Sequence, residues 1–211
     1  GNFDEQRYHV SLNVPLSSST ASTVFLNKAK GGGYVENNFT GKTLGGKNDA
    51  SARINIVSEI SDALELSFSA DYEHNDILAL TGTALTGVLG YEPESSPFAP
   101  IYDQHPGFSE AIRIKNETYA PWDSPQDKTI FGTSLTLDYY LNDDAIIKSI
   151  TAYRDTEMNM DVASDISPTA LLHTPYTDTY QQTTQEFQYI SPEIGNFNYI
   201  VGLYLSINRK I

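Results

Sequence analysis

Apolar and polar residues alternate along several stretches of this chain, which is the pattern of β-strands that have one apolar and one polar face. The clearest stretch covers residues 64–73, where every second position is apolar: Leu64, Leu66, Phe68, Ala70 and Tyr72. Because successive side chains of a strand point to opposite faces, the other face carries the carboxylates of this stretch, Glu65, Asp71 and Glu73. Residues 8–16, 131–141 and 197–208 alternate in the same way.

The remaining strands are weaker. Ile54 and Ile56 lie opposite Arg53 and Asn55, and a later pair, Phe187 and Tyr189, lies opposite polar neighbours. Two more segments, about Thr23–Ala29 and Ala145–Thr156, alternate poorly, and the sequence leaves their register open. Together these segments predict about eight strands.

The connections between these strands alternate between short and long. Short links are expected at Ser17–Thr20, Ser61–Asp62, Asn142–Asp144 and Pro192–Asn196; long links are expected at Lys30–Asp49, Ile77–Lys128 and Glu157–Asp178. In an up-and-down sheet every second connection lies at the same end, so one end has tight hairpins and the other has large loops. The predicted fold class is therefore all-β: an antiparallel, up-and-down transmembrane β-barrel segment with short periplasmic turns and long extracellular loops.

A soluble β-sandwich that binds carbohydrate is the alternative, because its strands also alternate. Two features favour the membrane barrel. The predicted strands run ~10 residues, longer than the usual ~5–6 of globular sheets. The apolar faces also tend to end in aromatic residues, which favour the membrane–water boundary: Tyr72, Phe131, Tyr139, Phe197 and Tyr199.

Composition excludes several classes of function. The chain has 13 Lys and Arg against 27 Asp and Glu, a net charge of −14, which argues against nucleic acid as a partner. The absence of cysteine excludes a disulfide scaffold and a thiolate metal site. No apolar run approaches the ~18 residues of a spanning helix, so a membrane role must use strands. The polar start at Gly1–Glu5 is not a signal peptide, and we expect the chain to begin inside a longer precursor.

The longest predicted loop, Ile77–Lys128, is the expected functional surface. Its rings lie among polar residues, and such rings stack on sugars or on aromatic and cationic ligands. The candidate ligand-binding residues are Tyr91, Tyr102, His105, Phe108, Tyr119 and Trp122. The alternative is a loop folded over its own aromatic side chains.

The sequence predicts no catalytic residue, no metal ligand and no cofactor site, and hence no enzyme. No Gly-x-Ser-x-Gly elbow occurs, and His105 and His173 lack a second ligand at a zinc-like spacing. His74 follows Glu73, but neighbouring strand residues face opposite sides and cannot both bind one ion. The strand carboxylates are interpreted as solvated wall residues facing a barrel lumen: Glu65, Asp71, Glu73, Asp138 and Glu186.

Several segments resemble the β-barrel region of TonB-dependent receptors, the energised uptake proteins of the outer membrane. In chain order they are Asn13-Val14-Pro15-Leu16, Gly33-Tyr34-Val35-Glu36-Asn37, the alternating run Ala63–Tyr72, Lys148–Asp155, Thr184–Pro192 and Phe197–Tyr204. Each segment alone is a weak match to the family. The resemblance rests on the order and spacing of the segments over nearly the whole chain.

The resemblance implies that residues 1–211 are the early part of a receptor barrel, without the plug domain, the TonB-binding segment and the remaining barrel strands. The family's barrel has 22 strands around a plugged lumen. The implied location is the outer membrane of a Gram-negative bacterium, and the implied partners are membrane lipid and lipopolysaccharide, the plug domain, TonB and a small-molecule nutrient. That nutrient is a siderophore–iron complex, a carbohydrate or a similar bulky ligand. A self-contained small outer-membrane barrel, acting as adhesin or enzyme, is the remaining alternative.

Overall fold

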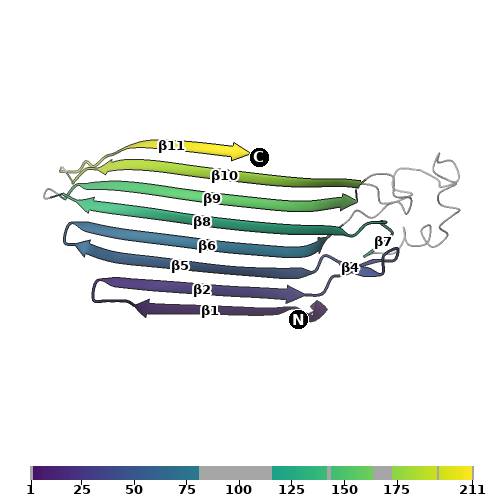
Figure 1. The fold of residues 1–211 in the computed structure, drawn as a ribbon. Helices are drawn as coiled ribbons and strands as arrows, with labels where there is room; N and C mark the ends of the chain where they lie inside the picture. Colours follow the sequence, from purple (N-terminus) through teal and green to yellow (C-terminus); the bar gives the residue numbers. More distant parts are fainter. Residues whose placement is uncertain (1, 81–115, 142–143, 164–172, 194, 211) are drawn as a thin grey trace.

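The computed structural model describes residues 2–80, 116–141, 144–163, 173–193 and 195–210 (Figure 1). Within these residues a short 3-10 helix, η1 (Asn2–Asp4), precedes eleven strands. Eight of the strands form one sheet, in the order β1 (Gln6–Pro15), β2 (Thr20–Gly31), β5 (Lys47–Ser61), β6 (Leu64–Ala79), β8 (Ser124–Tyr140), β9 (Ile146–Ala163), β10 (His173–Ile190) and β11 (Ile200–Lys210).

Every neighbouring pair in this sheet is antiparallel, and the strands follow one another in chain order from β1 at one edge to β11 at the other. Figure 1 shows the two termini at opposite edges of the sheet. The predicted antiparallel up-and-down arrangement of about eight strands is confirmed.

The register places the apolar positions of neighbouring strands on one face. Leu66 of β6 pairs with Leu137 of β8, and further along the same two strands Tyr72 pairs with Phe131. The register of β2, which the sequence left open, is set by its neighbour, because Leu26 pairs with Val10 of β1. Its Phe25 therefore lies on the polar face.

The apolar face is not covered by a second layer in the described part of the chain. Large apolar residues on it stay exposed, among them Phe131 at 42% and Leu203 at 58%. Buried apolar residues are few, and four of them gather at the loop end of the sheet: Val35, Leu44, Ala79 and Ala120. The described residues contain no helix with the length and hydropathy needed to span a membrane.

All four predicted short connections lie at one end of the sheet, which is the left-hand end of Figure 1. The strands extend further toward the other end than the alternation predicted. β6 continues to Ala79 and β8 begins at Ser124, so the ends of the predicted loop Ile77–Lys128 are strand. Backbone pairing continues there although the apolar alternation has ended, and this is why the sequence pattern missed it.

A small second sheet lies at the loop end. It consists of β4 (Lys42–Leu44), β3 (Val35–Asn37) and β7 (Glu117–Thr118), with β3 and β7 parallel. The sheet joins the connection between β2 and β5 to the connection between β6 and β8. The predicted long link Lys30–Asp49 therefore contains ordered structure of its own.

Candidate functional site: the polar face and the loop end

The polar face carries a row of side chains that the register aligns across the middle of the sheet. Arg53 of β5 pairs with Asp71 of β6, which pairs with Gly132 of β8. Gly132 in turn pairs with Arg154 of β9, which pairs with Gln182 of β10. Residues far apart in the sequence thus share one face at one height.

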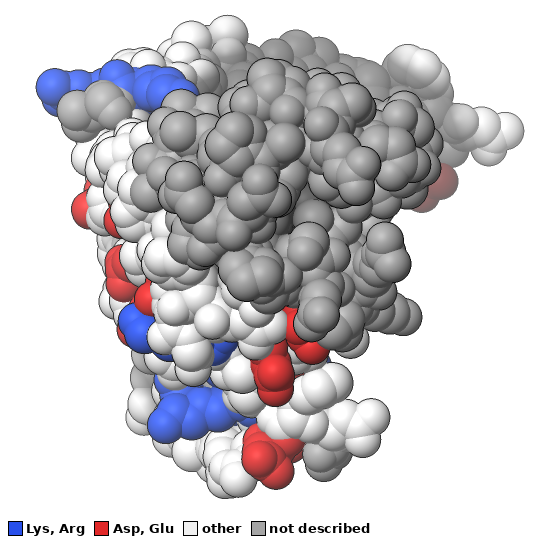
Figure 2. All heavy atoms as spheres, turned by 90° about the vertical axis from the view of Figure 1, so that its right-hand side faces the viewer, with Lys and Arg blue, Asp and Glu red and all other residues white. Residues whose placement is uncertain are grey.

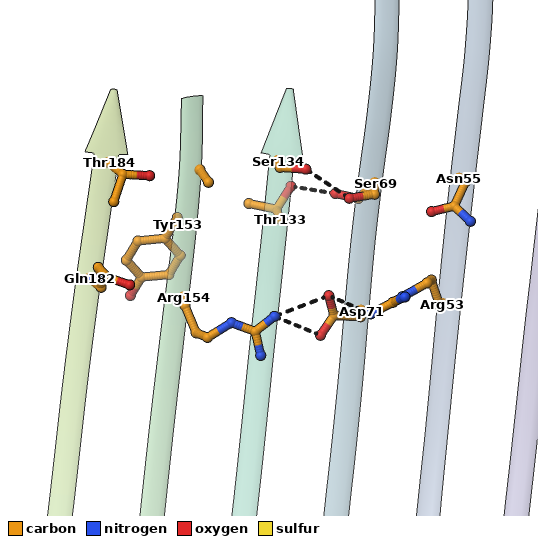
Figure 3. A pocket seen from close by; sticks show the side chains of 11 residues that line it. Arg53, Asn55, Ser69, Asp71, Thr133, Ser134, Tyr153, Arg154, Gln182 and Thr184 are labelled. Atoms are coloured by element: carbon orange, nitrogen blue, oxygen red, sulfur yellow. Dashed lines mark hydrogen bonds and ion pairs between the residues drawn. The ribbon is translucent and has the colours of Figure 1, made fainter. Parts of the chain in front are cut away.

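Two arginines of this row approach the same carboxylate. The Nη2 atom of Arg154 lies 3.4 Å from both carboxylate oxygens of Asp71. From the other side, Nη2 of Arg53 lies 3.6 Å from Asp71 Oδ1. Figure 3 shows the two guanidinium groups on either side of Asp71. The three side chains together carry a net charge of +1.

Gly132 makes the contact between Arg154 and Asp71 possible. Arg154 and Asp71 lie on β9 and β6, with β8 between them, so the arginine must cross β8. A Cβ atom at Gly132 would lie 2.8 Å from Arg154 Nη2 and 3.1 Å from Asp71 Oδ1. A glycine in the interior of a strand commonly marks a close approach of this kind.

A cleft of about 310 Å³ lies over this row, lined by the two arginines, Asp71 and mostly neutral polar side chains. Ser69 and Ser134 are hydrogen-bonded to one another across β6 and β8, at 2.8 Å between their hydroxyl oxygens. Gln182 and Thr184 of β10 complete the far wall. The cleft combines charged groups with hydroxyl and amide donors, which suits a polar ligand.

The strand carboxylates predicted to share one face do so. Glu65, Asp71 and Glu73 alternate with the apolar positions of β6, and Asp138 pairs directly with Glu65. Near the short turns Asp138 forms an ion pair with Lys148, with 3.2 Å between Nζ and Oδ1. Glu186 accepts a hydrogen bond of 2.6 Å from Gln188 on the same face.

The loop end is held together by buried polar contacts. Asn37 is 1% exposed; its amide donates to the carbonyl of Ala120 at 2.9 Å, and its oxygen accepts from the backbone N–H of Phe39. Asp123 accepts from the hydroxyl of Thr40 at 2.6 Å and pairs with Lys42 at 2.6 Å. These contacts connect residues of two separate connections in the chain.

Of the predicted ligand-binding residues, Tyr119 and Trp122 lie in the described part of the chain. Trp122 stacks on His173, the first residue of β10, with 4.7 Å between ring centroids and 18° between ring planes. His173 Nε2 lies 3.7 Å from Asp161 Oδ2. The other candidates, Tyr91, Tyr102, His105 and Phe108, lie outside the described residues, so ligand binding by this set stays a prediction.

Figure 2 views the molecule from this loop end, where acidic and basic side chains both lie on the described surface. Glu5 pairs there with Arg7 at 2.6 Å and with Lys47 at 2.9 Å. The hydrogen bonds from Lys47 and then Arg7 lower the pKa of Glu5 from its ordinary value of 4.5.

The arginine row was not among the predicted sites. Its members are distant in sequence, and only the sheet register brings Arg53, Asp71 and Arg154 together. The sequence did contain one signal, a glycine inside the strand that carries the alternating stretch of residues 131–141.

Comparison of the fold with solved structures identifies its architecture. The ferric yersiniabactin uptake receptor FyuA from Yersinia pestis matches 99% of this chain with a TM-score of 0.74 and 16% sequence identity. The open form of the ferric-catecholate import receptor Fiu from E. coli K12 matches 99% with a TM-score of 0.69 and 14% identity. The chain has the fold of part of a TonB-dependent receptor barrel.

A third structure agrees at a lower similarity. A G324V mutant of the ferric enterobactin receptor PfeA from Pseudomonas aeruginosa matches 98% of the chain with a TM-score of 0.54 and 15% identity. The chain spans only 29%, 32% and 28% of these three receptor chains, in the same order. No protein-family model and no curated protein sequence matches the chain. The resemblance to TonB-dependent receptors that the sequence indicated is confirmed at the level of fold.

Proposed function

We propose that this chain is part of the barrel wall of an outer-membrane, TonB-dependent receptor that takes up a scarce, bulky nutrient. The observation that carries this proposal is the single eight-stranded sheet with one apolar and one polar face, whose apolar face stays exposed. In a soluble domain that face would require a second apolar layer. In a barrel it contacts lipid, and the polar face lines the lumen.

The soluble-sandwich alternative requires a second sheet packed on the apolar face. In the described residues the remaining strands form a small sheet at the loop end, linking the two connections there. The exposed Leu203, Leu205 and Ile207 of β11 belong to the apolar face. Their exposure supports a lipid-facing surface over a sandwich core.

The sheet edges support a barrel larger than these eight strands. In the described structure β1 pairs with β2 and β11 pairs with β10, and the two edge strands are not paired with each other. An unpaired strand edge in hydrocarbon costs several kcal/mol for each exposed N–H or C=O group. We therefore infer that further strands flank β1 and β11, rather than a small barrel closed by these eight alone.

The end with short turns is the periplasmic end in this proposal, and the loop end is extracellular. The plug domain and TonB act through parts of the receptor other than this sheet, and lipid and lipopolysaccharide surround the apolar face. A ferric siderophore is the favoured ligand class, because the three receptors named above are receptors for ferric yersiniabactin, ferric catecholate and ferric enterobactin. The residues described here supply wall and loop, and no enzymatic step.

The proposal is tested in the Gram-negative host of the gene. Membrane fractionation is expected to recover the protein with outer-membrane porins, and gel migration is expected to change on boiling, as it does for stable barrels. Deletion of the gene is expected to abolish uptake of at least one iron-55-labelled ferric siderophore under iron limitation, and uptake is expected to require TonB. Recovery in the soluble fraction would contradict the membrane placement. Unchanged uptake across a panel of catecholate and phenolate siderophores would contradict the ligand class.

A further inference from the structure

The arginine row is a cationic position on a strongly acidic chain. The chain carries a net charge of −14, whereas Arg53, Asp71 and Arg154 together carry +1. Directly opposed like charges lie elsewhere on the same face, where Glu59 pairs with Glu65. The charged side chains that line the cleft, Arg53, Asp71 and Arg154, therefore sum to +1, whereas two carboxylates face each other near the short turns.

The two guanidinium groups remain accessible while they hold the carboxylate. The side chain of Asp71 is 21% exposed, and those of Arg53 and Arg154 are 55% and 46% exposed. A guanidinium has more N–H donors than one shared carboxylate accepts. The remaining donors are available to the cleft, beside the hydroxyl groups of Ser69, Ser134 and Thr184.

The cluster is also shaped by the backbone. Gly132 leaves the space through which Arg154 reaches Asp71, and any larger residue would displace the arginine or the carboxylate. The cleft of about 310 Å³ is at the lower end of the size of small-molecule sites, about 300–1,000 Å³. Planar guanidinium groups bind carboxylate and phosphate through paired hydrogen bonds.

We propose that Arg53 and Arg154, which lie on either side of Asp71, form a binding site for a soluble oxyanion, such as phosphate or a small molecule that bears a carboxylate or phosphate group. The site lies at mid-height on the polar face. It deepens the proposed function and rests on it, because the polar face then lines the lumen and the solute that passes this position is anionic.

Inorganic phosphate is the probe for the test. The protein, purified in a neutral detergent at low and constant chloride, is titrated with phosphate while the guanidinium N–H signals of ¹⁵N-labelled arginine are followed by NMR. The wild type is expected to show a saturable shift. Arg53→Gln and Arg154→Gln are each expected to weaken phosphate binding by about fivefold or more, as lost charge-assisted hydrogen bonds do. Gly132→Ala is expected to weaken it without any change of charge.

Asp71→Asn makes the test decisive, because it removes the negative charge between the two arginines. Phosphate binding is expected to tighten by about threefold or more at low salt. Arg7→Gln is the matched control: it removes the same charge from the polar face of β1, and phosphate affinity is expected to stay within about twofold, because distant exposed charges are screened.

The absence of a saturable shift in the wild type would overturn the proposal. Equal or weaker phosphate binding by Asp71→Asn would also overturn it, since a purely structural triad gives that result. If an arginine variant fails to fold, the comparison of phosphate binding by Asp71→Asn and by the wild type still tests the proposal. Gel migration before and after boiling reports barrel formation independently, so a failure of the proposed function is distinguished from a failure of the anion site.

Discussion

Among the polar side chains that interrupt the apolar face on β9 and β10, three hydrogen-bond to one another. Thr151 donates to Gln185 Oε1 at 2.6 Å, and Gln185 Nε2 donates to Ser149 Oγ at 3.0 Å. Leu135 of β8 pairs with Thr151, and Leu205 of β11 pairs with Gln185, so these polar groups lie at the depth of apolar neighbours. Mutual hydrogen bonding makes such residues compatible with a lipid-facing surface.

This network predicts that replacing one member lowers stability more than replacing the whole network. Thr151→Val is expected to lower the free energy of unfolding by about 1 kcal/mol, because Gln185 Oε1 loses its donor in an apolar environment. Replacing all three polar groups in Thr151→Val/Gln185→Leu/Ser149→Ala is expected to recover that loss, because no member of the network is then left without its partner. Urea titration of the protein in lipid vesicles measures these free energies. A triple variant that is less stable than Thr151→Val would contradict the explanation.

Glu5 predicts a pH dependence at the junction that precedes β1. Its pKa is lowered from 4.5 by hydrogen bonds from Lys47 and Arg7, so the carboxylate is favoured in the folded state. Its contribution to stability is therefore present above pH 4.5, the value for the unfolded chain, and is lost as pH falls through the lowered pKa. The ¹³C NMR titration of the Glu5 carboxyl is expected to show a midpoint below 4.5, and Lys47→Met is expected to raise it. An unchanged midpoint in Lys47→Met would show that Lys47 is not the cause.

The candidate site shows which residues a sequence can place and which it cannot. Alternation alone assigned Asp71 and Glu186 to the polar face, because the period of a strand fixes the side on which each residue lies. Arg154 and Asp71 are 83 positions apart in the chain, and their contact depends on the pairing of β6 and of β9 with β8 between them. That pairing, and with it the height at which the side chains meet, is set by the turns and neighbouring strands.

At the scale of elements, strong alternation predicted strands well and weak alternation left the register undetermined. β6 and β8 were assigned from their own residues, because the two faces of each strand differ sharply from one another in polarity. The segment in β2 alternates poorly since Phe25 lies on the polar face, near His9, with 6.5 Å between ring centroids. Its register follows from pairing with β1 and β5 rather than from its own sequence.

Gly31 and Gly33, in the run of three consecutive glycines at the end of β2, have different surroundings. Gly31 ends β2, and a Cβ there would make ordinary contacts of 3.6 Å with Glu5. A Cβ at Gly33 would lie 2.5 Å from the carbonyl oxygen of Leu44, a backbone atom. The close approach at Gly33 holds the chain against β4.

This difference predicts that alanine at Gly33 increases hydrogen exchange nearby, whereas alanine at Gly31 does not. Gly33→Ala is expected to separate the chain from β4 and to increase hydrogen exchange at Tyr34, whose N–H donates to Leu44 O at 2.9 Å. Gly31→Ala is the matched control and is expected to leave that exchange unchanged. Mass spectrometry of exchange over residues 33–44 measures both. Equal exchange in the two variants would contradict a steric role for Gly33.

For the whole molecule, the alternation of connection lengths is the feature that the sequence predicted most completely. Short turns lie at one end and longer connections at the other, as expected. The third predicted long link, Glu157–Asp178, is shorter than predicted, because β9 continues to Ala163 and β10 begins at His173. The small sheet formed within the long connections was not predictable. Its strands β3 and β7 belong to different connections, and their lengths of three and two residues leave no periodic signal.

Membrane placement of the whole sheet predicts how fluorescence depends on depth and on face. Trp122 is the only tryptophan and lies at the loop end, beyond the apolar stretch that ends at Tyr72. In a Trp122→Phe background, Phe68→Trp lies near the middle of that stretch on the apolar face, and Ser67→Trp lies beside it on the polar face. Lipids brominated in the middle of the acyl chain are expected to quench Phe68→Trp strongly and Ser67→Trp weakly, because quenching requires near contact.

Tyr72→Trp and Tyr139→Trp, at the two ends of the apolar stretch, are expected to respond more to bromine placed near the headgroup. Equal quenching of Phe68→Trp and Ser67→Trp would mean that the two faces do not divide lipid from lumen, and the uptake function would lose its structural basis.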